Sequence, residues 1–140
     1  MELSRGVRDD VVAHARAGAP EEIVGVLVGE RGPPDRVTRI ERATNAAATP
    51  ETRYELDPAE QLSLLESVES AGDEVIGFYH SHPNGPAGPS ATDADRATWD
   101  GYVYAIVSLA GEPSLGAWRW TGEAFEPLEV SVERDGDGEE

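Results

Sequence analysis

The sequence predicts an α/β domain in which a mixed β-sheet has helices packed on it. Apolar runs rich in β-branched residues, at positions 23–28 and 75–79, have the length and composition of strands that are buried on both faces. Segments with helical spacing and capping residues precede and separate these runs. Helices and strands therefore alternate along the chain, as they do in domains that pack helices against a sheet.

The first helix is expected to begin after Ser4, a suitable N-cap, and to end at Gly18 and Pro20. Its buried stripe at helical spacing consists of Val7, Val11, Val12 and Ala15. His14 lies on this stripe, and we interpret it as a packing or surface residue rather than as a metal ligand.

Two strands follow the first helix. The run at 23–28 is the first, residues 32–35 (GPPD) make a turn, and residues 37–43 alternate in character as a second strand does. Residues 44–52 are small, polar and rich in alanine. They predict a loop or an irregular sheet edge.

The second helix has the clearest local signature. Asp57 is a good N-cap, Pro58 suits the first helical position, and Glu60 has the offset of a capping box. The helical pattern continues through Leu62, Leu65, Val68 and Glu69. Gly72 is expected to end the helix.

The second half of the chain begins with a strand at 75–79 that leads into His80-Ser81-His82. A loop rich in proline and glycine occupies residues 83–89, and a short helix is expected from Ser90 through Trp99. Three further strands are predicted at residues 103–109, 115–120 and 124–132. Trp118 and Trp120 alternate on one of them as members of one sheet face, and Asp95 and Asp100 read as exposed helix carboxylates.

Composition limits the function. At 140 residues the chain fits one domain, expected at 1–132, followed by an acidic tail at 133–140 (ERDGDGEE). No apolar run approaches the roughly 20 residues of a membrane span, and no signal-peptide pattern opens the sequence, which predicts a cytoplasmic protein. Cysteine is absent, which excludes disulfides, thiol nucleophiles and cysteine-based zinc sites.

The charge is strongly negative, with 28 acidic and 11 basic residues and a formal net charge of −17. Such a surface repels phosphate backbones and disfavours nucleic-acid binding. All basic residues are arginine, and the acidic ones are scattered along the chain. This pattern favours adaptation to molar salt, where charges are screened within about 3 Å, over an acidic partner-binding surface.

A metal-binding pattern stands out at His80-x-His82, followed by Ser90 and Asp93. Histidines at i and i+2 on a strand point to the same face, so both imidazoles can reach one metal ion. A carboxylate on the following loop can supply a third ligand and leave a fourth position for water, as in catalytic zinc sites. The alternative is structural: Ser-x-x-Asp is also a helix-capping pattern.

These residues resemble the signature of the JAMM (MPN+) zinc metallopeptidases. The similarity covers Phe78 to Pro83 (FYHSHP), then Ser90 and Asp93, and upstream Pro20-Glu21-Glu22 before an apolar strand. The resemblance implies the MPN fold, which is cytidine-deaminase-like, with a curved mixed sheet between helices. It extends from about Leu3 to Trp120.

The resemblance also implies roles. His80, His82 and Asp93 would hold one Zn²⁺ per chain, and Ser90 would stabilise the oxyanion. The residues alone do not choose between Glu21 and Glu22 as general base. The resemblance selects Glu22, two positions after the proline.

The implied function is cleavage after the C-terminal Gly-Gly of ubiquitin-like modifiers, from target lysines and from linear fusions, as in compact archaeal relatives. Modifier proteins and their conjugates are the expected partners. An extended tail could add to a sheet edge, for which residues 44–54 are the candidate. Two alternatives remain: a peptidase acting on sulfur-carrier adducts and a non-catalytic MPN scaffold. A relative of the fold associated with DNA repair is disfavoured by the charge.

Overall fold

The computed structural model describes residues 1–51, 53–85 and 88–133. In this part of the chain one eight-stranded sheet has the strand order β7-β6-β5-β4-β2-β3-β1-β8. The strands are β1 (Glu2–Ser4), β2 (Val24–Glu30), β3 (Arg36–Ala43), β4 (Glu74–His82), β5 (Val103–Ser108), β6 (Ser114–Trp120), β7 (Phe125–Leu128) and β8 (Ser131–Glu133), and the helices are α1 (Arg5–Gly18), α2 (Pro58–Ser70) and α3 (Ala91–Arg96). Within these residues no helix is long and apolar enough to cross a membrane.

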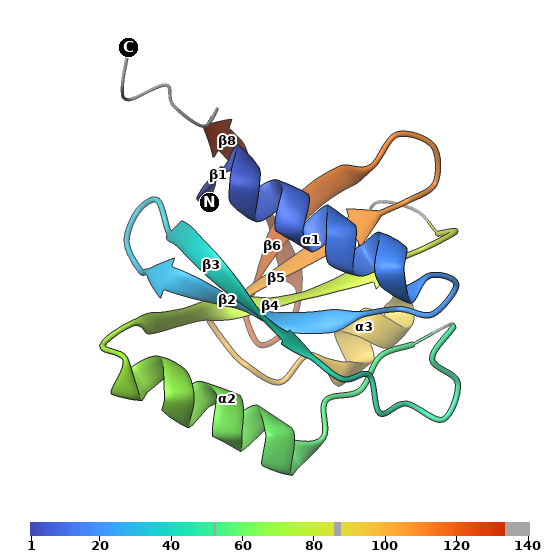
Figure 1. The fold of residues 1–140 in the computed structure, drawn as a ribbon, viewed down its shortest axis with the longest axis horizontal. Coiled ribbons are helices and arrows are strands. Elements are labelled where there is room, and N and C mark those ends of the chain that lie inside the picture. Colours follow the sequence, from blue (N-terminus) through green and yellow to red (C-terminus); the bar gives the residue numbers. More distant parts are fainter. Residues whose placement is uncertain (52, 86–87, 134–140) are drawn as a thin grey trace.

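The sheet is mixed and carries a hydrophobic core on each face. β4 pairs antiparallel with β2 and parallel with β5. α1 lies over one face and α2 lies on the other side (Figure 1). Val11, Leu27 and Tyr79 belong to the core beneath α1, whereas Val68 and Phe78 belong to the core beneath α2. The predicted fold class, a mixed sheet packed between helices, is confirmed.

The sheet is curled so that its two ends approach each other. β7 and β8 stand at opposite ends of the strand order, although only two residues separate them in the chain. The amino group of Met1 donates to Glu129 O over 2.7 Å, and Ser131 N–H donates to Met1 O over 2.9 Å. The single strand predicted at 124–132 is therefore wrong. The chain leaves β6 after Leu128 and joins β1.

The local signals of α1 and α2 are confirmed. Ser4 caps α1 by accepting from Val7 N–H at 3.1 Å, and Asp57 caps α2 by accepting from Glu60 N–H at 3.1 Å. The Glu60 side chain accepts from Thr44 N–H, so it ties the helix to the chain after β3. His14 is buried in the core beneath α1, which confirms its interpretation as a packing residue.

Two predicted boundaries are corrected. α3 ends at Arg96, because Ala97 is already extended, with φ −70° and ψ 124°. Trp99, expected in that helix, instead packs against Phe78 with ring centroids 5.5 Å apart. β1 was not predicted: its three residues carry no periodic signal, and its pairing with β3 and β8 is long-range. The predicted acidic tail lies outside the described residues, except for Glu133 at the end of β8.

A close approach explains one glycine in β2. Gly25 pairs with Tyr79 of β4, and a Cβ atom on Gly25 would lie 2.3 Å from Tyr79 Cζ. The Tyr79 ring crosses over β2 to reach His14, whose Nδ1 is 2.7 Å from Tyr79 Oη. Only a residue without a side chain leaves room for this ring.

Candidate metal centre

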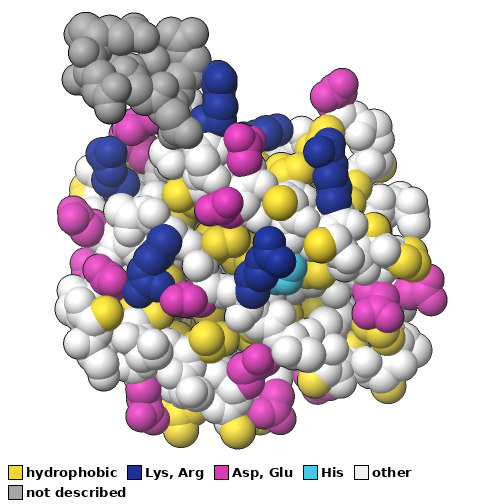
Figure 2. Space-filling model, viewed as in Figure 1, with side chains coloured by type: hydrophobic (Ala, Val, Ile, Leu, Met, Phe, Trp, Pro, Cys, Tyr) yellow, Lys and Arg dark blue, Asp and Glu magenta, His cyan; other side chains and the backbone are white. Residues whose placement is uncertain are grey.

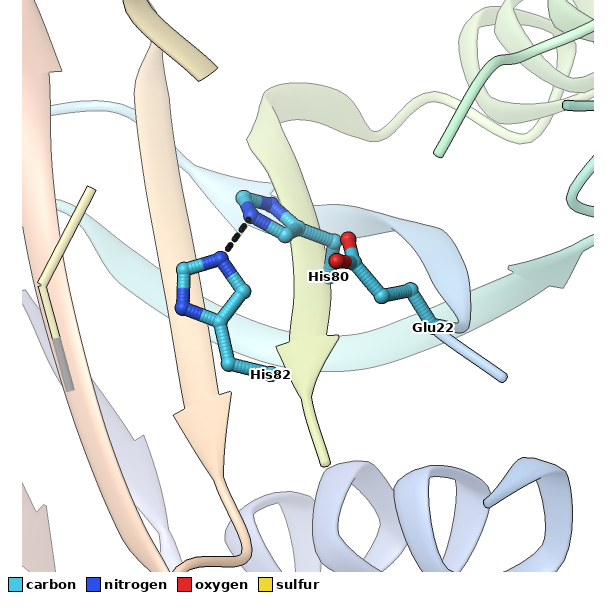
Figure 3. Close-up of side chains that lie close together, drawn as sticks. All are labelled: Glu22, His80 and His82. Atoms are coloured by element: carbon cyan, nitrogen blue, oxygen red, sulfur yellow. Dashed lines mark hydrogen bonds between the residues drawn. The ribbon is translucent and has the colours of Figure 1, made fainter. Parts of the chain in front are cut away.

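The two histidines of the motif lie at the end of β4, the strand between β2 and β5. His80 and His82 project from the same face, and their Nε2 atoms are 3.2 Å apart (Figure 3). Both are buried, with exposed fractions of 2% and 6%. Strand alternation thus brings the imidazoles together, as the i, i+2 spacing predicted.

Asp93 completes a triangle with the histidines. Its Oδ1 is 3.2 Å from His80 Nε2 and its Oδ2 is 3.1 Å from His82 Nε2. Three ligands of a tetrahedral zinc ion, each bound at 2.0–2.1 Å, would have their donor atoms about 3.3 Å apart. The three side chains therefore have the spacing that one small metal ion requires.

Glu22 approaches from the segment that leads into β2. Its carboxylate points toward His80 (Figure 3), and Glu22, His80 and His82 each offer a ligand atom within 4.8 Å of the others, a group able to hold a metal ion. Glu22 is 6% exposed, and its Oε1 is the buried side-chain atom without a hydrogen-bond partner among the described residues. Such an atom costs free energy unless a further group satisfies it, so the residues fit a site completed by a metal ion or water.

The environment determines the protonation states. Burial raises the pKa of Glu22 to about 7; the nearby His82 opposes this shift and Asp93 adds to it. Burial also lowers the pKa of His80. Burial alone would raise the pKa of Asp93, but hydrogen bonds with His80 and His82 hold it well below its usual range. Neutral imidazole and ionised carboxylate are the forms that bind a metal ion.

Ser90 lies at the start of α3 and is exposed. It forms a capping box with Asp93, which confirms the capping interpretation of Ser-x-x-Asp. The box holds the Asp93 carboxylate toward the histidines. The hydroxyl accepts from Asp93 N–H over 3.0 Å, which leaves its own hydrogen available for donation.

Three residues that the sequence did not single out surround this group. The Tyr54 ring stacks on His80, with centroids 4.2 Å apart and an interplanar angle of 26°. The Ser81 hydroxyl accepts from Ile23 N–H over 2.9 Å, which links the histidine strand to the residue after Glu22. Asn45 donates to Glu22 O. The available signals in the sequence were a lone amide in an alanine-rich loop and a serine between two histidines.

The segment proposed as a docking edge, residues 44–54, has no strand among its described residues. Asn45 forms one isolated bridge with Leu56, and Pro50 O accepts from Glu22 N–H at 2.7 Å. The segment therefore packs beside the site as an irregular loop rather than as a sheet edge. Tyr54, whose ring stacks on His80, also lines a cavity of about 170 Å³. The cavity is lined by Tyr54, Glu55, Leu56, Gln61, Phe78, Thr98, Trp99 and Tyr104.

Comparison with known proteins identifies the family to which the chain belongs. Residues 4–121 match the family described as prokaryotic homologs of the JAB domain, and the chain belongs to that family. The structure also resembles the solution structure of a Desulfitobacterium hafniense protein, with a TM-score of 0.86, 31% identity, and coverage of 96% of this chain and 93% of that one.

Several similar proteins that match over most of this chain are named for an activity, among them a desampylase and a CysO-cysteine peptidase. The desampylase of Haloferax volcanii is 47% identical over 137 residues, which cover 95% of this chain and 96% of that protein. The CysO-cysteine peptidase of Mycobacterium tuberculosis is 43% identical over 98 residues, covering 70% of this chain and 66% of that protein.

Proposed function

We propose that this protein is a zinc-dependent isopeptidase that removes ubiquitin-like modifiers from lysines of target proteins, and that also cleaves linear modifier fusions. The observation that carries the proposal is the triangle of His80, His82 and Asp93 beside Glu22. The Oε1 atom of Glu22 has no hydrogen-bond partner within the described part of the chain. The similarity to the desampylase over nearly the whole length of both chains supports the choice of reaction and of partners.

His80, His82 and Asp93 would hold one Zn²⁺, because two histidines and one carboxylate with a free fourth position are the ligands of catalytic zinc. Zinc bound there polarises a carbonyl and lowers the pKa of water to about 7. We assign the third ligand to Asp93 rather than Glu22, since Asp93 contacts both Nε2 atoms at 3.1–3.2 Å.

Glu22 would act as the general base. Its Oε1 has no hydrogen-bond partner among the residues that the structure describes, so it can take a proton from the attacking water and pass it to the leaving lysine amine. A pKa of about 7 allows both transfers near neutral pH. Ser90 would donate its hydroxyl hydrogen to the carbonyl oxygen as negative charge develops there.

The cavity that Tyr54 lines supports an extended modifier tail as substrate. Four aromatic rings line it, from Tyr54, Phe78, Trp99 and Tyr104. This lining suits an apolar side chain upstream of the cleaved bond. Two glycines at the bond itself would present no side chain to the tightly packed residues around the metal.

The test measures zinc content and cleavage of a modifier–lysine isopeptide at molar salt, for wild type and Glu22→Ala. One zinc in both proteins with turnover in wild type alone would support the proposal. Absence of zinc from both proteins would contradict the proposal. It would indicate that the histidine pair has a structural role and that the domain is a non-catalytic scaffold.

A second candidate is hydrolysis of a carrier protein–cysteine adduct, favoured by the similarity to the CysO-cysteine peptidase. It keeps the same zinc site and changes only the leaving amine. Turnover of a carrier–cysteine adduct without turnover of the lysine isopeptide would select this reaction instead.

A further inference from the structure

Asn45 occupies a position between the proposed general base and the aromatic ring on His80. Its Nδ2 donates to Glu22 O and to Arg53 O, both at 2.9 Å. Its Oδ1 accepts from Ala47 N–H at 2.9 Å and from Glu55 N–H at 3.0 Å. One half-buried side chain thus binds four backbone groups from three segments.

The chemistry of these partners requires an amide. Two partners are carbonyl oxygens, which need donors, and two are N–H groups, which need acceptors. An asparagine side chain supplies two donor hydrogens and two acceptor lone pairs, so its whole capacity is used and only one orientation of the amide satisfies the partners. Aspartate has the same shape, but it would turn a carboxylate oxygen toward two carbonyl oxygens.

The groups that Asn45 binds flank the metal centre on two sides. Glu22 O is bound by Asn45 while Glu22 N–H donates to Pro50 O, so both backbone groups of Glu22 are held by the same loop. Arg53 and Glu55 are the neighbours of Tyr54, which stacks on His80. The amide therefore joins the backbone of the base to the segment that covers a ligand.

We propose that Asn45 is a positioning residue for the hydrolytic reaction: it holds the Glu22 backbone and the Tyr54 segment in register, so that the carboxylate faces the metal centre and the ring packs on His80. The inference rests on the proposed function. Asn45 contacts neither the metal ligands nor the reacting atoms, and it acts through Glu22 and Tyr54. A displacement of about 1 Å in such a group can reduce turnover about 100-fold.

The test compares Asn45→Asp and Asn45→Ala with wild type, using zinc-loaded enzyme and a linear modifier fusion as substrate. Asn84→Asp is the matched control, because it adds the same charge at an exposed asparagine after β4. We expect kcat to fall about 10- to 100-fold in both Asn45 variants. KM should stay within about threefold and zinc should remain at one per chain, while the control stays close to wild type.

Amide hydrogen exchange supplies a readout independent of turnover. Protection of the Glu22 amide, which donates to Pro50 O, should decrease in both Asn45 variants. Protection of the Ala47 amide should persist in Asn45→Asp, which keeps the acceptor, and decrease in Asn45→Ala.

Two results would overturn the proposal. One is kcat near the wild-type value in folded Asn45 variants. The other is a parallel fall of kcat, zinc content and thermal midpoint, which would indicate a merely structural residue. A wild-type chain that binds zinc but cleaves no modifier would refute the proposed function instead, and the exchange data would still decide whether Asn45 tethers Glu22.

Discussion

Ser90 and Asp93 hold each other through reciprocal hydrogen bonds. Asp93 N–H donates to Ser90 Oγ over 3.0 Å, and Ser90 N–H donates to Asp93 Oδ2 over 2.8 Å. The same Asp93 oxygen lies 3.1 Å from His82 Nε2. The cap of α3, a helix of six residues, therefore also directs the Asp93 carboxylate toward the histidines. The same two side chains determine the stability of the cap and the geometry of the candidate metal centre.

Two replacements of Ser90 should separate the contribution of its hydroxyl to catalysis from the contribution of the residue to the stability of the helix cap. Ser90→Ala and Ser90→Gly both remove the hydroxyl, which accepts from Asp93 N–H. Glycine at an N-cap, however, costs only a few tenths of a kcal/mol, compared with about 1 kcal/mol for alanine. If the hydroxyl stabilises the oxyanion, both variants should lose about 100- to 1000-fold in kcat despite their different unfolding free energies. Activity that follows stability instead would assign Ser90 to capping alone.

Asp93→Asn should reduce zinc binding sharply, because it keeps the shape and the acceptor oxygen of the cap but removes the ligand charge. We expect zinc well below one per chain and a thermal midpoint that no longer responds to a chelator, since a metal stabilises only the state that binds it. Asp57→Asn makes the same chemical change at the cap of α2 and should leave zinc content unchanged. Full zinc occupancy in Asp93→Asn would contradict the assignment of this ligand.

Gly25→Ala should destabilise the fold, because the new Cβ would lie 2.3 Å from Tyr79 Cζ. Relieving that overlap requires a shift of β2 or of the buried ring, and overpacking of this kind costs about 1–3 kcal/mol. Urea unfolding measures the loss. Gly88→Ala is the control, since its Cβ would meet the Trp118 ring at an ordinary 3.9 Å. Equal stability of the two variants would show that the Tyr79 ring does not require a residue without a side chain at position 25.

His14 should stay neutral until about pH 4, because burial, with a smaller contribution from Arg42, lowers its pKa to about 4. In the unfolded chain this residue binds a proton near its ordinary pKa of 6.5. Above pH 6.5 His14 is neutral in both states, so its full contribution to the free energy of unfolding is present there. It is lost as the pH falls from 6.5 toward 4. NMR titration of the His14 ring measures the pKa directly, and a value near 6.5 would contradict the packing described here.

Raising salt should stabilise the protein and increase its turnover. Figure 2 shows arginine and acidic side chains interspersed on the face that carries α1 and β3, within a chain of net charge −17. Molar KCl shortens the screening length to about 3 Å and weakens the repulsion among scattered carboxylates. Thermal midpoint and cleavage rate from 0.1 to 2 M KCl provide the test. A rate that falls over this range would argue against adaptation to high salt.

The sequence by itself determined the features that depend on near neighbours. The caps at Ser4 and Asp57, the buried run of β2 and the shared face of His80 and His82 follow from chemistry within a few residues, where periodicity and capping act. The motif resemblance added the expectation that Glu22, Ser90 and Asp93 would join the pair. The structure places Asp93 and Glu22 beside the histidines and ties Ser90 to Asp93.

Only the tertiary structure decided what depends on distant partners. β1 and the separation of β7 from β8 arise from pairing between the two ends of the chain, which no local pattern encodes. The link between Ile23 and Ser81 joins residues 58 apart, and the roles of Asn45 and Tyr54 follow from how their loop packs beside Glu22. Single hydrogen bonds and ring contacts of this kind produce no periodic pattern in a sequence. They depend on which distant segments the folded chain brings together.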